Sequence, residues 1–220
     1  MQENLNIIIT GASGMVGEAV LMECLQADEV QKILVVGRRS CGIQHTKLKE
    51  ILHPNFFDLS SIENRLAGYN ACLFCLGVSS IGMKEVKYRK FTYDLTLLFA
   101  QTVLKENNEM SFCYISGAGT DSSEMGRQML ARVKGKTEND LKKLPFKAEY
   151  NFRPGLLIPT AGQKHVLIAY KYLGWMASII KILSPSSICT LRQLGKAMIH
   201  AVSRGYEKNI LEVKDIKKLA

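Results

Sequence analysis

Apolar runs alternate with amphipathic stretches over the first 155 residues of the chain. Where several β-branched residues are consecutive, as in Ile7, Ile8 and Ile9, the pattern favours a strand buried on both faces of a parallel sheet. On this basis strands are predicted over residues 5–9, 32–37, 54–58, 71–76, 111–115 and 149–152. Helical spacing recurs over residues 18–25, 60–67, 84–106 and 121–144, the last with a break near Gly135. The alternation predicts an α/β fold, a doubly wound parallel sheet with helices on both faces.

Two of these helices carry further signals. The helix over residues 60–67 has Ser60 as its N-cap and Gly68 as its stop. In the helix over residues 84–106 the apolar positions Val86, Phe91 and Leu95 recur at helical spacing, so we expect them to face the core.

The pattern changes beyond residue 155. An apolar run over residues 166–183 is interrupted by Lys171 and Lys181, which leaves fewer than the roughly twenty apolar residues that cross a bilayer. It is interpreted as a helix covering the ligand side of the sheet, with an interfacial membrane helix or an oligomer surface as alternatives. A capped helix over 190–204, a strand over 210–213 and a basic helix over 215–219 follow. We expect one domain over 1–220, with 1–155 as its core and 156–220 as an extension.

Composition narrows the class of protein. With 220 residues and 47% hydrophobic content, the chain can bury one full core. The net charge of +9 suits an anionic partner, but acidic residues interrupt each lysine cluster and no nucleic-acid-binding module accompanies the charge. We therefore expect no nucleic-acid partner. The polar start Met1 to Asn4 leaves no room for a secretory signal, which predicts a cytoplasmic location.

Six cysteines lie mostly inside apolar runs, as free thiols of a reducing compartment do. Cys72 and Cys75 have a suggestive spacing, but residues three apart on a strand point to opposite faces. A redox pair or a zinc half-site is therefore disfavoured, and no metal site is predicted.

A glycine-rich turn joins the first strand to the first helix. In Thr10-Gly11-Ala12-Ser13-Gly14-Met15-Val16-Gly17, the first glycine allows a tight turn, the second lets a diphosphate approach the main chain, and the third lets the helix pack closely on its strand. The amides at the start of this helix form an anion site. Because a strand precedes the motif and a helix follows it, the sequence predicts dinucleotide binding.

The residues that end the second strand indicate which dinucleotide. A fold of this kind places an acid there to hold ribose hydroxyls, or an arginine to hold a 2'-phosphate. The chain has Gly37, Arg38 and Arg39 and no acid, which favours NADP(H) over NAD(H) because guanidinium pairs with phosphate through two charge-assisted hydrogen bonds. The alternative is that both arginines are solvated surface residues.

Taken together, the glycine motif, Gly37-Arg38-Arg39, Asp58, Cys75-Leu76-Gly77, Ser116, Val133-Lys134-Gly135 and Arg153-Pro154-Gly155 resemble the short-chain dehydrogenase/reductase superfamily. Within it the chain is similar to the atypical members of the Tat-interacting oxidoreductase-like group. The resemblance implies a Rossmann fold and a nicotinamide cofactor. It implies the following cofactor contacts: Thr10, Gly11, Ser13, Gly14, Met15, Val16, Gly17, Arg38, Arg39, Asp58, Leu59, Leu76, Gly77, Lys134, Pro154 and Gly155. Asp58 would lie at the adenine, or it is an ordinary turn residue.

The superfamily performs its chemistry with a serine, a tyrosine and a lysine four residues after the tyrosine. Ser116 and Lys134 match, but the tyrosine position is Leu130, and no tyrosine occurs between Tyr114 and Tyr150. A missing general acid costs about a hundred- to ten-thousandfold in rate. Lys134 could donate the proton itself if burial lowers its pKa, or it could be a ribose-binding or surface lysine. Ser116 could equally be a turn serine.

Two functions fit these residues. The first is an NADP(H)-dependent oxidoreductase that acts on an unidentified carbonyl or hydroxyl substrate with Ser116 and Lys134 in its site. The second is a non-catalytic NADP(H)-binding sensor or scaffold, which Leu130 favours. A homodimer fits either function. A third, weaker hypothesis, contact with a membrane surface, rests on the apolar run over 166–183 and the positive charge.

Overall fold

A seven-stranded parallel sheet organises the protein in the computed structural model, which describes residues 4–166 and 187–220. Its strands are β1 (Leu5–Thr10), β2 (Val30–Gly37), β3 (Leu48–Leu52), β4 (Ala71–Phe74), β5 (Ser111–Ile115), β6 (Ala148–Arg153) and β9 (Ile210–Glu212), in the order β3-β2-β1-β4-β5-β6-β9. Every neighbouring pair is parallel, so the carboxyl ends of all seven strands meet at one edge. The predicted doubly wound parallel sheet is confirmed.

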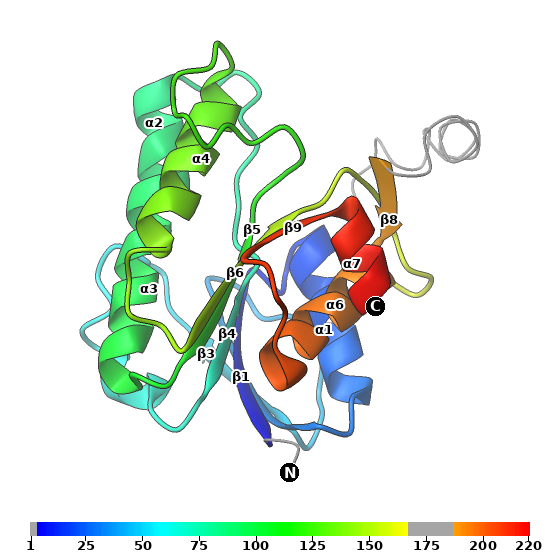
Figure 1. Ribbon diagram of the computed structural model, residues 1–220. Coiled ribbons are helices and arrows are strands. Elements are labelled where there is room, and N and C mark those ends of the chain that lie inside the picture. The colour runs from blue at the N-terminus through cyan, green and yellow to red at the C-terminus, as the bar shows by residue number, and fades with distance from the viewer. Residues whose placement is uncertain (1–3, 167–186) are drawn as a thin grey trace.

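Helices cover both faces of this sheet (Figure 1). One face carries α1 (Met15–Gln26), α6 (Leu191–Arg204) and α7 (Val213–Leu219). The other carries the 3-10 turn η1 (Glu63–Leu66), α2 (Glu85–Arg89), the π-helical segment η2 (Lys90–Asp94), α3 (Leu95–Glu106) and α4 (Met129–Leu141). Since α2, η2 and α3 follow one another without a gap, they form the long helix predicted over residues 84–106.

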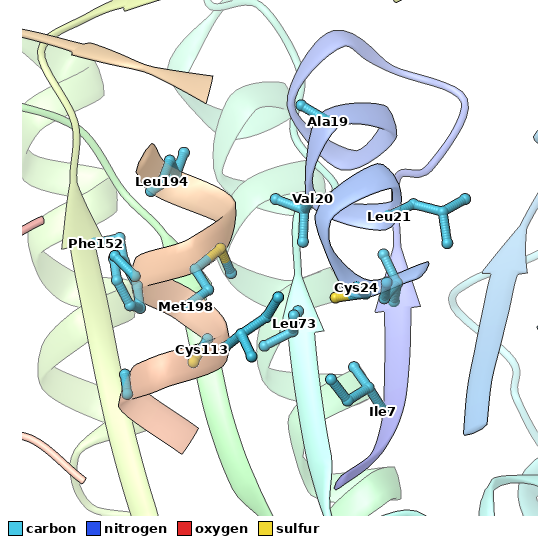
Figure 2. Close-up of a cluster of buried hydrophobic side chains, with 14 of the residues drawn as sticks. Ile7, Ala19, Val20, Leu21, Cys24, Leu73, Cys113, Phe152, Leu194 and Met198 are labelled. Atoms are coloured by element: carbon cyan, nitrogen blue, oxygen red, sulfur yellow. The ribbon is translucent and has the colours of Figure 1, made fainter. Parts of the chain in front are cut away.

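Side chains of successive strand residues enter two separate cores, as the period of a strand requires. Ile7 and Ile9 pack toward α1 and α6, whereas Ile8 packs toward α3. Figure 2 shows the first core, in which strand residues Ile7, Leu73, Cys113 and Phe152 meet Val20, Cys24, Leu194 and Met198 from the two helices. Cys72 belongs to one core and Cys75 packs against the other, so these two thiols lie on opposite faces of the sheet as expected.

The extension adds a second, smaller sheet that the sequence pattern did not reveal. Its strands β7 (Leu156–Ile158) and β8 (Ile188–Thr190) have three residues each, too few for an alternating pattern to be recognised. Thr190 then caps α6, accepting a hydrogen bond from the Gln193 amide in a complete capping box, which confirms the predicted capped helix. Strand β9 and helix α7 lie where the sequence predicted them.

The third strand was predicted in the wrong place. Residues 54–58 form turns, and the strand is β3 at the edge of the sheet. Its residue Ile51 is buried, whereas Lys49 and Leu52 are exposed. Charged Lys49 and Glu50 concealed it from a search for apolar runs. The helix predicted over 60–67 is also wrong, because only the turn η1 forms and its N-cap is Ile62 rather than Ser60.

Two further predictions need correction. Helix α4 continues through Gly135, where a Cβ atom would lie 1.8 Å from the backbone oxygen of Asp121. The glycine is therefore required by the close contact of a loop and does not break the helix. Val86 faces away from the core and is 84% exposed. The apolar run over 166–183 falls, except for its first residue, outside the described residues, among which no helix is long and apolar enough to cross a membrane.

Candidate functional site

The turn between β1 and α1 lies at the carboxyl edge of the sheet, and its glycines are required by contacts. Gly11 has φ +72, and a Cβ atom there would lie 2.7 Å from the backbone oxygen of Cys75. At Gly17 a Cβ atom would lie 2.2 Å from the backbone oxygen of Gly11, so only glycine lets α1 pack this closely on the turn. At Gly14 the nearest atom is 3.4 Å away, which leaves this side of the turn open to a ligand. The turn therefore has the shape that a diphosphate needs.

The start of α1 supplies the donors for such an anion. The first amides of a helix have no carbonyl partner within the helix and carry the positive end of its dipole. Glu18, in the first turn, is a carboxylate that would oppose an anion, but its two oxygens accept the backbone N–H groups of Lys164 and His165, each at 2.8 Å. Gln163 also donates to the Met15 carbonyl at 2.7 Å. These bonds fasten the loop after β7 to helix α1, and local sequence patterns do not show them because the bonded residues are 146 to 148 positions apart.

A groove of about 160 Å³ runs beside the turn and is lined by Gly11, Ser13, Gly14, Gly37, Arg38, Arg39, Cys75, Leu76 and Gly77. It brings together the residues that follow β1, β2 and β4. Thr10 holds the end of β1 next to the end of β4, because its buried hydroxyl accepts a hydrogen bond from the Leu76 amide at 3.2 Å. Both arginines are exposed, and the residues that line the groove include no acid. The groove is therefore positively charged at the end of β2.

A second cavity of about 520 Å³ shares Arg38, Leu76 and Gly77 with the groove. Its other lining residues are Pro54, Asn55, Phe56, Phe57, Val78, Met83, Lys90, Phe91 and Leu95. The rings of Phe57 and Phe91 meet edge to face, with centroids 5.7 Å apart. A flat, apolar group of a ligand that occupies the groove would fit beside these rings.

Asp58 and Leu59 are not among the residues that line either cavity. The Asp58 carboxylate accepts the Ser60 hydroxyl at 2.7 Å and the Ser60 amide at 3.1 Å, and these bonds lower its pKa. Leu59 is buried in the core behind the cavity. The turn role that the sequence left open for Asp58 matches its contacts, while Asn55 and Phe57 from the same loop line the larger cavity.

Ser116 and Lys134 are brought together where β5 ends. The Lys134 ammonium donates to the Ser116 backbone oxygen at 2.6 Å. Burial lowers the pKa of Lys134 to about 8, while the negative charge of Glu138 opposes this shift. The Thr120 hydroxyl donates to the Gly117 carbonyl at 2.7 Å, so the Ser116 hydroxyl, 2.9 Å from that of Thr120, is the donor between them. Near neutral pH the lysine carries a proton that it releases easily.

The general-acid position of the motif carries no tyrosine. Leu130 lies in the first turn of α4, half-buried and one helical turn before Lys134. Tyr114, at the end of β5, is buried in the core on the α3 and α4 face, where burial raises its pKa. Within the part of the chain that the structure describes, Ser116 and Lys134 are groups at this edge that could supply a proton to a reacting group.

The end of β6 completes the site. The Ala118 amide donates to the Pro154 carbonyl at 2.9 Å, and a Cβ atom at Gly155 would lie 2.1 Å from the Ser187 backbone oxygen. Arg153 pairs with the buried carboxylate of Glu138, and also with Glu212 at 3.4 Å. The sequence analysis missed this ion pair. The feature that could have indicated it is Glu138, which lies one helical turn after Lys134 on the same face of α4. The ion pair fixes α4, and with it Lys134, against the end of β6.

No protein-family model matches the chain. Protein HTATIP2 of Rattus norvegicus is 25% identical over 158 residues, which are 71% of this chain and 64% of the rat protein. The chain thus spans less than two thirds of the rat protein's length. Protein FMP52, mitochondrial, of Eremothecium gossypii is 27% identical over 156 residues, or 70% of this chain and 67% of that protein. The sequence resemblance to the Tat-interacting group is confirmed by the first of these relatives.

Solved structures agree on the fold. A short chain dehydrogenase family protein from Francisella tularensis superposes with a TM-score of 0.65 at 14% identity, covering 94% of this chain and 96% of that one. The Bordetella bronchiseptica enzyme WbmF, solved in complex with NAD+, gives a TM-score of 0.68 at 13% identity, covering 99% and 77%. Identities this low establish fold alone. The chain therefore has the Rossmann fold of the short-chain dehydrogenase/reductase type and is similar in sequence to the Tat-interacting protein HTATIP2.

Proposed function

We propose that the protein is an NADP(H)-binding oxidoreductase of the atypical short-chain dehydrogenase/reductase type, acting on a carbonyl or hydroxyl substrate. The observation that carries the proposal is the groove in which the glycine turn, the start of α1 and two unopposed arginines converge. A diphosphate fits the open side of Gly14, and a 2'-phosphate fits Arg38 and Arg39. The names of the relatives and neighbours, among them a dehydrogenase and a complex with NAD+, support a nicotinamide cofactor without deciding its phosphate.

The remaining predicted cofactor contacts concern the adenine and the nicotinamide, which would lie on either side of the groove. The adenine would lie in the larger cavity beside Phe57, with Leu76 and Gly77 along the cofactor's edge. Pro154 and Gly155 would lie near the nicotinamide, because they flank the end of β5. A bound nicotinamide supplies a hydride for a carbonyl carbon, and the protein must then supply a proton to the carbonyl oxygen.

Lys134 is the proposed source of that proton. Its pKa of about 8 leaves the ammonium form dominant at neutral pH, while the cost of releasing a proton is small. Ser116 would orient the carbonyl after its hydroxyl turns from Thr120. Because Leu130 neither donates nor accepts a proton, we expect tight cofactor binding and slow reduction of generic aldehydes and quinones.

Single-turnover oxidation of NADPH, followed by its fluorescence, tests this function. We expect Leu130→Tyr to raise the rate by at least about tenfold, below the full effect of a positioned general acid. Leu130→Phe, which adds the ring without the hydroxyl, should give no gain. In the native protein the rate should fall as pH rises through about 8, and Lys134→Met should abolish that dependence.

Two outcomes would contradict the proposal. Cofactor binding with no oxidation by the native protein or Leu130→Tyr would favour the alternative, a non-catalytic NADP(H)-binding sensor or scaffold. Fast turnover that Lys134→Met leaves unchanged would place the proton donor elsewhere.

Three expectations from the sequence stay predictions: a cytoplasmic location, a homodimer and the absence of a nucleic-acid partner. The fungal relative has the word "mitochondrial" in its name.

A further inference from the structure

Three large apolar side chains are almost fully exposed at one end of the molecule. Ile81, in the loop after β4, is 92% exposed; Val86, in α2, is 84% exposed; Met125, in the loop before α4, is 87% exposed. Single exposed apolar residues are ordinary on protein surfaces. Here three such residues belong to two neighbouring segments, since Ile81 precedes Val86 by five residues and hydrogen bonds join the segment of Val86 to that of Met125.

Arg132 joins the segments that carry Val86 and Met125. Its guanidinium donates to the Glu85 carboxylate at 2.7 Å and to the backbone oxygens of Gly126 and Arg127 at 2.6 and 2.8 Å. Val86 follows Glu85 and Met125 precedes Gly126, so one side chain holds together the two segments that carry these apolar residues. Figure 1 shows α2 beside α4, with the loops that precede them at the same end of the molecule.

The charges around these residues are mainly positive. Lys84, Lys87 and Arg127 are exposed within two residues of Val86 or Met125. Glu85, the acid among them, is paired with Arg132.

Two more acids lie in the loop before α4, and both are engaged. Glu124 lies 3.8 Å from the Lys136 ammonium. The Asp121 carboxylate accepts the amides of Ser123 and Gly126. These amides are neutral and leave the Asp121 charge in place, but the three exposed cations outnumber it, so the surroundings of the apolar side chains carry a net positive charge.

We propose that this basic apolar tip, formed by Ile81, Lys84, Val86, Lys87, Met125 and Arg127, docks on an anionic lipid bilayer. The apolar side chains would enter the interfacial region while the lysines and the arginine contact lipid phosphates. A protein partner fits less well, because a stable protein interface buries about 800 Å² on each side, far more than three projecting side chains offer. The loop that carries Ile81 also lines the 520 Å³ apolar cavity with Val78 and Met83, which places the cavity next to the membrane.

Vesicle co-sedimentation of the full chain without nucleotide tests this surface independently of cofactor binding. The probes are phosphatidylcholine vesicles with and without phosphatidylserine. We expect binding only where phosphatidylserine is present, and weaker binding at high salt. The triple variant Ile81→Ser, Val86→Ser, Met125→Ser and the double variant Lys84→Glu, Lys87→Glu should each lower the partition coefficient by at least about tenfold.

Matched controls use exposed residues elsewhere. Leu52→Ser with Ile210→Ser removes two other exposed apolar side chains, and Lys32→Glu with Lys49→Glu reverses two other exposed charges. These variants should bind nearly as the native chain does. The proposal is overturned if the native chain binds neither vesicle, or if the triple variant binds as well as the control. Concentration-dependent dimers that the triple variant cannot form, with no vesicle binding, would overturn it too and assign the tip to self-association.

Discussion

Glu149→Gln should stabilise the protein more at high pH than at low pH. Glu149 lies in β6 and is 5% exposed, and neither of its carboxylate oxygens has a hydrogen-bond partner among the described residues. Burial raises the pKa of this carboxyl to about 8, from 4.5 for a free glutamate side chain. A buried, unpaired acid is favourable only while it is protonated.

The sign and size of the effect follow from the two pKa values. Well below pH 4.5 the carboxyl is protonated in both the folded and the unfolded chain, so its contribution to stability does not change with pH there. As pH rises to about 8, the unfolded chain ionises while the folded one does not, so stability falls by about 1.4 kcal/mol per pH unit. Between about pH 5 and about pH 8 the loss sums to about 3 to 4 kcal/mol, an upper value because water can reach a buried acid.

Urea unfolding followed by far-ultraviolet circular dichroism measures this difference at each pH. Glutamine has the same shape and does not titrate, so any constant cost of its amide cancels from the pH dependence. The stability gain of Glu149→Gln over the native chain should grow with pH, whereas exposed Glu109→Gln should show no such trend. A gain that is flat with pH, or that shrinks as pH rises, would refute this account of Glu149.

Three further changes test the site and its supports. Gly17→Ala should abolish NADPH binding, because its Cβ atom would overlap the Gly11 carbonyl, whereas Ser61→Ala, at an exposed position that lines neither cavity, should preserve binding; equal calorimetric affinities would contradict the packing of the turn. Arg153→Met should cost about 3–5 kcal/mol in urea unfolding by leaving a buried carboxylate unpaired, and a second change of Glu138 to Gln should recover much of it. Thr190→Ala should cost about 1 kcal/mol through the lost helix cap; no change would mean that the cap contributes nothing.

Local patterns were enough to predict the elements that form the glycine turn and the groove beside it. Strand β1, the glycine turn and helix α1 follow one another directly, and each has strong preferences of its own. The edge strand β3 was misplaced because Lys49 and Glu50 stand between Leu48 and Ile51, so its apolar residues form no continuous run. The phenylalanines after it are buried without being in a strand, since they close the larger cavity.

Contacts between distant segments were beyond the reach of the sequence. From the sequence, Gly135 was interpreted as a helix break. Its presence is explained by the Asp121 backbone, which packs so closely against α4 that no side chain fits at this position. The Arg153–Glu138 ion pair and the bonds from Glu18 to the loop at Lys164 likewise depend on how the strands and helices are arranged. The roles of Ser116 and Lys134 were predicted from a resemblance, whereas their bonds to Thr120 and to the Ser116 carbonyl became visible only in three dimensions.

Isothermal titration of NADPH and NADH into the native chain and Arg38→Glu tests the central claim most directly. Arg38 lines both the groove and the larger cavity, so it is placed to meet the 2'-phosphate whichever way the adenosine enters. We predict that the native chain binds NADPH at least about tenfold more tightly than NADH, and that Arg38→Glu reverses the preference by placing a negative charge against the phosphate. Equal affinities of the native chain for the two cofactors, or no binding of either, would contradict the account.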